Sequence, residues 1–189
     1  MPNESGYRRG LAVARQEFVR RLRRRDARAW EELFLAWSGK LYAFALHTTG
    51  EPTVAQDIVS ETFARAYRDI DRFGRSGSAV ESWLYTIARH RLADFHRQRS
   101  RARLVHLDAA SNVAATTDSS AEVTGRDLSA QLRGAIAQLP RDQRAVVLLR
   151  FFGMLSGEET AAVLGKSHGA VRQLQLRALR NLRAVLAGM

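Results

Sequence analysis

The chain lacks several residue types and patterns, and each absence excludes a class of protein. It contains no cysteine, which excludes disulfide scaffolds, thiolate metal sites and cysteine nucleophiles. No apolar run approaches the roughly 20 residues that a membrane span needs, and the N-terminus has no hydrophobic segment followed by a cleavage site. Alternating strand patterns bounded by turns are also missing, and proline is confined to positions 2, 52 and 140. The sequence therefore predicts an all-α, soluble protein of the cytoplasm.

Acidic residues are few relative to basic ones. The 189 residues include 30 Lys and Arg against 19 Asp and Glu, a net charge of +11, and 46% of the chain is hydrophobic. A basic chain with enough apolar residues to build a core attracts polyanions, whereas a disordered basic tail lacks such a core. Only Lys40 and Lys166 are lysines, and guanidinium is the better group for contacts with phosphate and guanine. These features predict an anionic partner.

The charge is unevenly distributed along the chain, which indicates two domains. Residues 1–103 carry a net charge of +8 and residues 128–189 a net charge of +6. Between them, residues 104–127 carry a net charge of −3, are rich in Ala, Ser, Thr and Asp, and show no apolar stripe. We interpret residues 104–127 as a flexible acidic linker. It would join a helical bundle at 11–103 to a smaller helical domain at 128–187.

Both domains carry local signals for helices. Thr53–Gln56 and Ser156–Glu159 fit a capping box, in which two free backbone N–H groups are satisfied reciprocally. Pro140 is expected in a first helical turn, where its missing N–H costs nothing. Apolar residues recur at helical spacing and are expected in the core: Ile58, Phe63, Ala66 and Tyr67 in one helix, and Leu84, Ile87, Ala88, Leu92 and Phe95 in another.

The segment from Leu155 to Leu186 predicts a helix-turn-helix. A short helix is expected to end at Leu164, Gly165 supplies a left-handed turn, and Ser167 offers an N-cap for a second helix. At about 100° per residue, the second helix has two opposite arcs: an apolar one of Val171, Leu174, Ala178 and Leu182, and one of Arg172, Gln173, Leu176, Arg177, Arg180 and Arg183. Arginine pairs with guanine and glutamine with adenine, so the second arc suits the DNA major groove. A solvated basic face on an ordinary helical hairpin is the alternative, and the turn glycine with the small residues Ala161 and Ala162 favours DNA.

A helix expected over Ser82–Arg103 carries a second basic surface. Seven basic residues, opposed only by Asp94, are expected on its exposed side: Arg89, His90, Arg91, Arg97, Arg99, Arg101 and Arg103. Like charges at this density repel one another unless an anion is bound. Phe73, Trp83 and Tyr85 lie near the start of this helix, beside the small-residue loop at 74–79, and such a site holds an unstacked base of a single strand. The alternative for Trp83 is core packing, and the ring serves both roles if only one of its faces is buried.

Five short motifs occur in an order known from one protein family. Residues 139–144 read LPRDQR, residues 156–165 read SGEETAAVLG, and Gly169–Arg172 is followed by Arg177 and Ala178. These stretches resemble region 4 of bacterial sigma-70-type transcription initiation factors, especially the small extracytoplasmic-function (ECF) group. Residues 55–63 (AQDIVSETF) and 82–90 (SWLYTIARH) resemble region 2 of the same group. The chain departs from the family's usual pattern at three places: Gln56, Ser60 and the pair Leu174–Gln175, where many members place the core residue second.

The resemblance implies an alternative sigma factor, not an enzyme, which binds core RNA polymerase and directs promoter-specific initiation. Region 4 would contact the β flap and read the minus-thirty-five element as duplex DNA through Ser167, His168, Gly169, Arg172, Gln173, Leu176, Arg177 and Arg180. Region 2 would melt and hold the minus-ten strand through Ser76, Gly77, Ser78, Trp83, Arg89, His90 and Arg97. It would dock on the β′ clamp helices through Asp57, Ser60 and Glu61. An anti-sigma factor is a further expected partner, and no cofactor, metal or small-molecule substrate is implied.

Two other functions stay open at this point. A polymerase-independent helix-turn-helix regulator would share the DNA-reading helix, would not need the Asp57–Glu61 surface, and would bind duplex DNA tightly by itself. A nucleic-acid enzyme would need clustered acids or metal ligands, and the five histidines show no such pattern: His47, His90, His96, His106 and His168. The basic run Arg20–Arg28 either touches DNA or coats the first helix.

Overall fold

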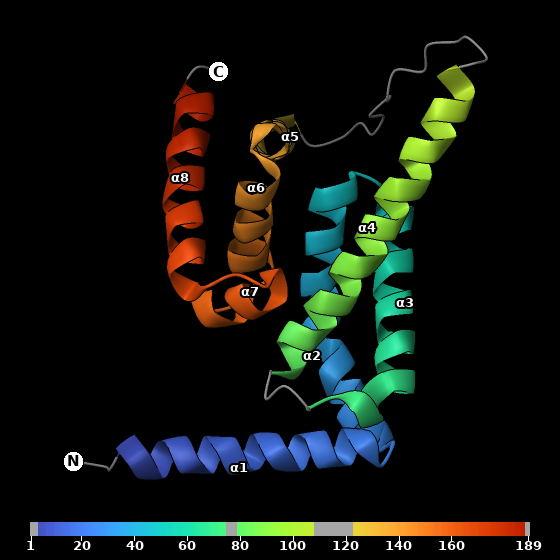
Figure 1. The fold of residues 1–189 in the computed structure, drawn as a ribbon, viewed down its shortest axis with the longest axis vertical. Helices are drawn as coiled ribbons and strands as arrows, with labels where there is room; N and C mark the ends of the chain where they lie inside the picture. Colours follow the sequence, from blue (N-terminus) through green and yellow to red (C-terminus); the bar gives the residue numbers. More distant parts are fainter. Residues whose placement is uncertain (1–3, 75–78, 108–122, 188–189) are drawn as a thin grey trace.

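The computed structural model describes residues 4–74, 79–107 and 123–187, and within these ranges it contains helices and no strand. The expected minus-ten residues Ser76, Gly77 and Ser78 lie outside the described residues, as does the central part of the expected linker. Figure 1 shows the helices, whose bounds are α1 (Glu4–Arg23), α2 (Ala27–Thr49), α3 (Pro52–Asp69), the 3-10 turn η1 (Ile70–Arg72), α4 (Val80–Leu107), α5 (Val123–Gln138), α6 (Arg141–Val147), the π-helical turn η2 (Leu148–Phe152), α7 (Gly157–Leu164) and α8 (His168–Ala187). The all-α class predicted from the sequence is confirmed.

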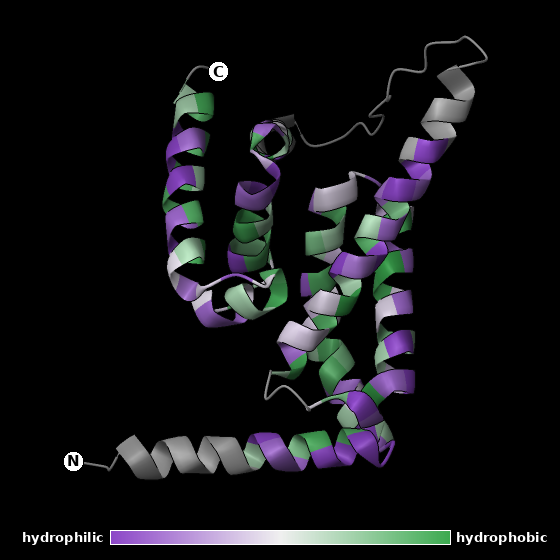
Figure 2. Ribbon diagram, viewed as in Figure 1, coloured by the Kyte–Doolittle hydropathy of each residue, from purple (hydrophilic) through white to green (hydrophobic). Residues whose placement is uncertain are grey.

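Helices α2, α3 and α4 pack against one another, and α1 crosses one end of this N-terminal bundle (Figure 1). Apolar residues lie along the inward sides of the helices and polar residues along the outward sides (Figure 2). Most of the expected core residues are buried, among them Ile58, Leu84 and Leu92. Two are not: Tyr67 is 45% exposed and Phe95 is partly exposed. The Tyr67 ring lies 5.0 Å from that of Trp30, with the guanidinium of Arg25 above it, so it covers the core from outside.

Helices α5 to α8 form the C-terminal domain, in which α6 and α7 both pack on α8. Ser156 and Glu159 form the expected capping box at the start of α7, and Gly165 ends this helix with a φ of +63°. Ser167 accepts a hydrogen bond from the backbone N–H of Ala170 at 3.2 Å, which confirms it as the cap of α8. The turn between the two helices therefore follows from local sequence signals.

Two expectations about helix starts are wrong. Thr53 caps nothing, because α3 begins one residue earlier at Pro52 and its N-cap is Glu51, which makes no side-chain cap. The fixed φ of Pro52 and its missing N–H suit the first helical position and set the start of the helix. Pro140, in turn, is the N-cap of α6 and not part of its first turn, since its carbonyl accepts from the N–H of Arg144 at 2.9 Å.

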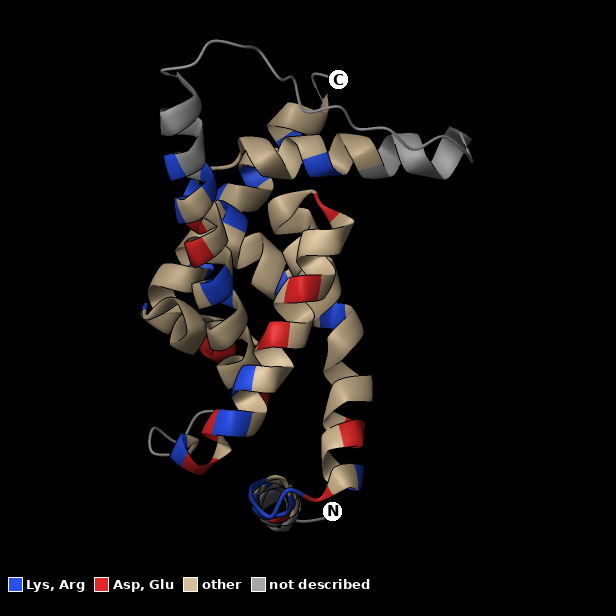
Figure 3. Ribbon diagram, turned by 90° about the vertical axis from the view of Figure 1, so that its right-hand side faces the viewer, with Lys and Arg blue, Asp and Glu red and all other residues tan. Residues whose placement is uncertain are grey.

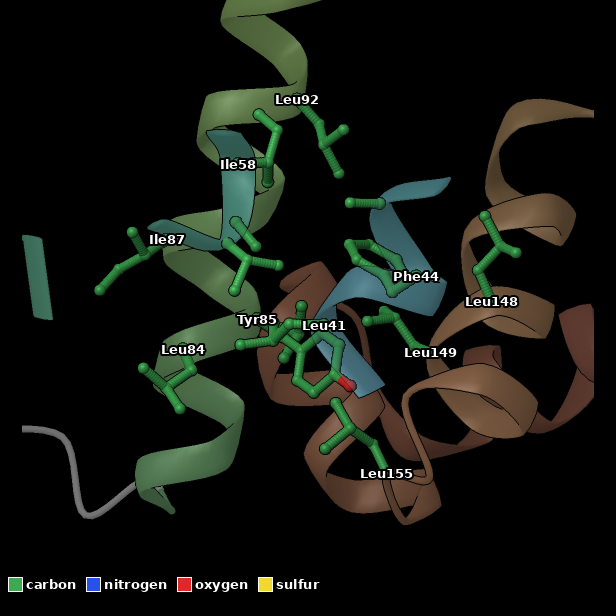
Figure 4. Packing of buried hydrophobic residues seen from close by; sticks show 14 of the residues in the cluster. Leu41, Phe44, Ile58, Leu84, Tyr85, Ile87, Leu92, Leu148, Leu149 and Leu155 are labelled. Carbon is green, nitrogen blue, oxygen red and sulfur yellow. The ribbon is translucent and has the colours of Figure 1, made fainter. Parts of the chain in front are cut away.

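The N-terminal bundle and the C-terminal domain are docked against each other through one continuous apolar cluster. The turn η2 packs on α2, and α7 packs on α4. Figure 4 shows Leu148, Leu149 and Leu155 of the C-terminal domain facing the bundle residues Phe44 and Tyr85. Gly153 belongs to this contact, because a Cβ there would lie 3.1 Å from the Tyr85 ring and 2.6 Å from the carbonyl oxygen of Leu149. The sequence did not predict this docking.

Candidate nucleic-acid interface

The exposed face of α8 carries every residue expected to read the minus-thirty-five element. Val171, Ala178 and Leu182 are buried against the C-terminal domain, which turns the opposite arc of the helix outward. All eight expected residues lie on that exposed side or at its capping end: Ser167, His168, Gly169, Arg172, Gln173, Leu176, Arg177 and Arg180. A helix held by an apolar back, with arginine and glutamine in front, has the chemistry for reading base edges in the major groove.

The start of α8 is held tightly by its neighbour α7. A Cβ on Gly157, the first residue of α7, would lie 2.6 Å from Nε2 of His168, so the imidazole rests directly on the glycine backbone. Lys166 pairs with Asp142 at 2.8 Å, and Asn181 donates to Gln143 at 2.8 Å. Two residues of the LPRDQR motif therefore stabilise the position of the recognition helix. Asp142 acts just before the start of α8, and Gln143 acts near its C-terminal end.

Arg150 supports the recognition helix, a structural role that the sequence did not reveal. Its Nε donates to Oε1 of Gln175 at 3.2 Å, and its Nη1 donates to the carbonyl of Leu155. Gln175 stands where many family members place a core residue, and it is half-buried here. The hydrogen bond from Arg150 satisfies its polar side chain, so Leu174 can pack on the apolar side of the helix. No spacing in the sequence signals a partner 25 residues away.

The basic surface of α4 is more strongly neutralised than the sequence indicated. Arg91 pairs with Glu61 at 3.1 Å and Arg99 pairs with Glu51, both across from α3, in addition to the expected partner Asp94, which pairs with Arg97. Acidic positions therefore lie among the basic ones over the bundle (Figure 3). Asp94 is not the only opposing acid, because the packing of α3 on α4 brings two further carboxylates to this side.

Only one of the three aromatic residues expected to stack on a base is available for it. Tyr85 is fully buried and packs edge-on against Phe44 at 5.3 Å, and this burial raises the pKa of its hydroxyl. Phe73 is 5% exposed. Trp83 is half-buried, with its ring 5.0 Å from that of Phe73, and so presents part of its surface. Of the other expected minus-ten residues, His90 and Arg97 are exposed and Arg89 is half-buried.

The expected polymerase-binding residues lie together on the outer side of α3. Asp57, Ser60 and Glu61 are all exposed. Phe34 of α2 is 46% exposed, with its ring 4.9 Å from that of Phe63 of α3, and the next residue, Leu35, is 72% exposed. The exposure of these two side chains was not predicted from the sequence, although three successive apolar residues at 33–35 exceed what one helical stripe can bury.

Family comparisons agree with this geometry. The model of sigma-70 region 2 matches residues 33–102, and that of sigma-70 region 4 matches residues 135–184. The ECF RNA polymerase sigma factor EcfG of Rhodopseudomonas palustris is 34% identical over 152 residues, which cover 80% of this chain and 82% of that protein. The chain belongs to the ECF sigma factors. This membership favours the sigma-factor interpretation over a polymerase-independent regulator.

Two further relatives of this ECF sigma factor extend the comparison. The ECF RNA polymerase sigma factor BldN of Streptomyces coelicolor is 38% identical over 175 residues, and the match covers 90% of this chain but only 65% of BldN. The chain thus spans less than two thirds of that relative. The sigma factor RpoE of Bartonella quintana, solved with the anti-sigma factor NepR, has the same fold at a TM-score of 0.65 and 24% identity, covering 83% of this chain and 96% of RpoE.

The structure gives no sign of a metal centre or membrane anchor in the residues it describes. Among residues 4–74, 79–107 and 123–187, no three His, Asp or Glu side chains are grouped as they would be to bind a metal ion. The helices in these ranges are all too short or too polar to cross a membrane.

Proposed function

We propose that this ECF sigma factor binds core RNA polymerase in the cytoplasm and directs initiation at specific promoters. The observation that carries the proposal is the exposed face of α8, where arginine and glutamine project from a helix whose opposite side is buried. In this proposal, residues 11–103 act as region 2, residues 104–127 as the linker, and residues 128–187 as region 4. The chain binds and positions nucleic acid and carries out no catalytic step of its own.

Region 2 would hold the melted minus-ten strand along the exposed side of α4. Unstacking a base costs a few kcal/mol, which capture in a pocket or on an aromatic ring recovers. Trp83 provides the partly exposed ring, and basic groups nearby attract the strand: Arg89, His90 and Arg97. Ser76, Gly77 and Ser78, outside the described residues, complete the proposed site.

The outer side of α3 would dock on the β′ clamp helices of the polymerase, and region 4 on the β flap. Asp57 and Glu61, although Glu61 is paired with Arg91, place carboxylates on this surface beside the polar Ser60, and carboxylates are unsuited to DNA and suited to a protein partner. Phe34, whose ring contacts Phe63 of α3, and the exposed Leu35 next to it in sequence would add apolar area, which is the usual source of binding energy at the centre of a protein interface.

The docked arrangement would have to open on a promoter. Elements centred at minus ten and minus thirty-five lie about 25 base pairs apart, or about 85 Å along B-form DNA. In the structure α7, the partner of the recognition helix, lies directly against α4. The two proposed reading surfaces are therefore too close together to contact both elements at once. By analogy with RpoE, we propose that an anti-sigma factor also binds this protein.

Transcription in vitro tests the proposed function. The purified chain is added to sigma-free bacterial core polymerase on a library of promoter fragments, with core polymerase alone as the control. Specific start sites that disappear when Arg172 and Arg177 are both changed to Ala would support the proposal. Tight duplex binding by the protein alone, without polymerase-dependent initiation, would contradict it.

A further inference from the structure

The basic run Arg20–Arg28 lies before the part of the chain that matches region 2, and the structure shows what it contacts. The run forms the end of α1, the tight turn after it and the first two residues of α2, and we call it the elbow (residues 20–28). Arg20 pairs with Glu17 at 2.8 Å. Arg21 pairs with Asp26 at 3.0 Å and with Glu32 at 3.1 Å. Several positive charges of the elbow are therefore neutralised by carboxylates of the same chain.

Several hydrogen bonds fix the shape of the elbow. Asp26 caps α2 by accepting from the backbone N–H of Ala29 at 3.1 Å, and the hydrogen bonds from Arg21 and Ala29 lower the pKa of its carboxyl group. Nε1 of Trp30 donates to the carbonyl of Leu22 at 3.0 Å. Arg25 adopts a left-handed φ of +59°, which a residue with a side chain keeps only where its surroundings hold it.

Two arginines of the elbow reach the segment 71–74, which directly precedes residues 75–78 in the sequence. Nη2 of Arg25 pairs with Asp71 at 3.0 Å, and Nη2 of Arg23 donates to the backbone carbonyl of Phe73. Arg23 also packs closely on Gly74, where a Cβ would lie 3.0 Å from its Nη2. Gly74 has a φ of +91°, so the chain turns sharply at the point that Arg23 holds.

Phe73, whose carbonyl accepts the hydrogen bond from Arg23, also packs against the ring of Trp83. The Phe73 and Trp83 rings lie 5.0 Å apart at an angle of 36°. Phe73 is buried and Trp83 is half-buried, so Phe73 forms the inner wall against which the tryptophan is oriented. A continuous set of contacts thus runs from the elbow through Phe73 to the proposed base-stacking ring.

We propose that Arg23 is a positioning residue for minus-ten recognition: it fixes the Phe73 backbone and thereby the orientation of Trp83, and Arg25 supports it through Asp71. This inference rests on the proposed role of Trp83 in holding the minus-ten strand. Direct contact of the basic elbow with DNA is the competing explanation. Under that explanation, Arg24 and Arg28 should matter as much as Arg23, because both are exposed and their side chains make no hydrogen bond or ion pair with the described part of the chain.

The test compares Arg23→Met, which keeps the side-chain stem and loses the donors, with Arg24→Met, which removes the same charge one residue away. Arg23→Lys, which keeps a donor at similar reach, is the conservative variant. Fluorotryptophan labelling of the full chain gives resonances for Trp30, Trp37 and Trp83, and Trp83→Phe assigns the last. We expect Arg23→Met to move the Trp83 resonance, Arg24→Met to leave it in place, and Arg23→Lys to return it toward its original position.

A functional readout accompanies the spectrum. With core polymerase and a promoter found in the transcription assay, permanganate reactivity reports unpaired thymines in the minus-ten element. We expect Arg23→Met to lower this reactivity by about tenfold, with polymerase binding unchanged, and Arg24→Met to have no effect.

Equal losses for both variants, or a loss with the Trp83 resonance unmoved, would overturn the inference. If the resonance moves while Trp83→Ala leaves melting intact, the proposed role of Trp83 fails and the positioning inference fails with it. Absence of any polymerase-dependent melting by the unaltered chain would instead remove the proposed function itself.

Discussion

Arginine side chains in this protein serve two purposes that composition does not separate. Arg23, Arg25 and Arg150 are tied to carbonyl, carboxylate or amide oxygens and hold backbone segments in place. Arg172 and Arg177 on α8 are exposed and make no ion pair with the described part of the chain. An unpaired guanidinium on a rigid helix keeps its donors free for an incoming phosphate or base. The count of 30 basic residues therefore overstates the number of cations that are free to bind DNA.

Replacing either free arginine should weaken recognition of the minus-thirty-five element. We expect Arg172→Ala and Arg177→Ala each to reduce affinity for that duplex by about 1–3 kcal/mol, because a side-chain contact to a base edge or phosphate is lost. Binding of the polymerase holoenzyme to promoter duplexes, measured at several salt concentrations, separates the two kinds of contact. A base contact changes sequence preference, and a phosphate contact lowers the salt dependence.

Arg68→Ala is the matched control for this experiment. It removes one exposed positive charge from α3, in the other half of the molecule. An equal loss of affinity for Arg68→Ala would show that overall charge, and not the α8 face, determines binding.

At the scale of helices, the helix-turn-helix is specified by interactions within a few residues. Ser156 accepts from the N–H of Glu159 at 3.1 Å, and the Glu159 side chain accepts from the N–H of Ser156 at 2.7 Å. The left-handed Gly165 and the cap from Ser167 then set the angle at which α8 leaves α7. The orientation of the DNA-reading face depends on these short-range contacts.

Loss of the cap on α7 should destabilise the C-terminal domain. We expect Ser156→Ala to lower the free energy of unfolding by about 1 kcal/mol, since the N–H of Glu159 loses its partner. Thr53→Ala is a matched control, because Thr53 occupies a similar sequence pattern and caps nothing. Chemical denaturation followed by circular dichroism gives both values. A loss for Thr53→Ala as large as that for Ser156→Ala would contradict the cap assignments.

At the scale of the whole molecule, the docking of the two domains limits what the protein can bind at one time. The imidazole of His47 in α2 and the ring of Phe152 in η2 lie 3.9 Å apart at the edge of the shared apolar cluster. Arg15 of α1 pairs with Glu81 of α4 and lies 3.9 Å from Glu159 of α7, so it too bridges the bundle and the C-terminal domain. Opening the molecule exposes the cluster and breaks these contacts.

Shortening Phe152 should shift the molecule toward an open form. We expect Phe152→Ala to weaken docking by about 2 kcal/mol, roughly half the cost for a fully buried phenylalanine, because this ring is half-buried. Fluorescence energy transfer between labels at Arg68→Cys and Arg183→Cys reports the distance between the domains, and the absence of native cysteine makes this labelling specific. Phe151→Ala is the control, since Phe151 is 49% exposed. A similar change in transfer for both variants would contradict the docking role of Phe152.

Acid should also favour the open form, through His96 on α4. Although the His96 side chain is exposed overall, partial desolvation of its ring lowers its pKa below the usual 6.5. The positive charges of Arg99 on the same helix and of Arg141 and Arg144 on α6 lower this pKa further. In an open form, away from α6, the pKa rises toward 6.5. As the pH falls below this value, the open form takes up a proton before the docked form does, so docking weakens. Above it, both forms are neutral and the effect vanishes.

The same energy-transfer assay between pH 7.5 and 5.5 tests the role of His96. We expect the transfer to fall with acid in the unaltered chain and to fall less in His96→Gln. His90→Gln, which removes an exposed imidazole from the same helix, is the control. Identical pH profiles for His96→Gln and the unaltered chain would rule out His96 as the titrating group.

The sequence by itself determined the helical class, the helix-turn-helix and the exposed face of α8. These depend on residues close together in the chain, such as the Ser156 cap, the turn at Gly165 and the helical spacing of Val171, Ala178 and Leu182. Apolar periodicity also identified most of the core. Its failures, Tyr67 and Phe95, lie where a neighbouring element decides whether an aromatic ring is covered.

Tertiary structure alone decided which charges are free, which aromatic residue can meet a base, and how the two domains meet. Arg23 and Phe73 are 50 residues apart, and Arg150 and Gln175 are 25 apart. Tyr85 is buried partly by a domain that begins more than 35 residues later in the chain. Periodicity along one helix carries no information about such pairs, because they form only when separate helices pack and each polar group takes the partner that the packing brings within reach.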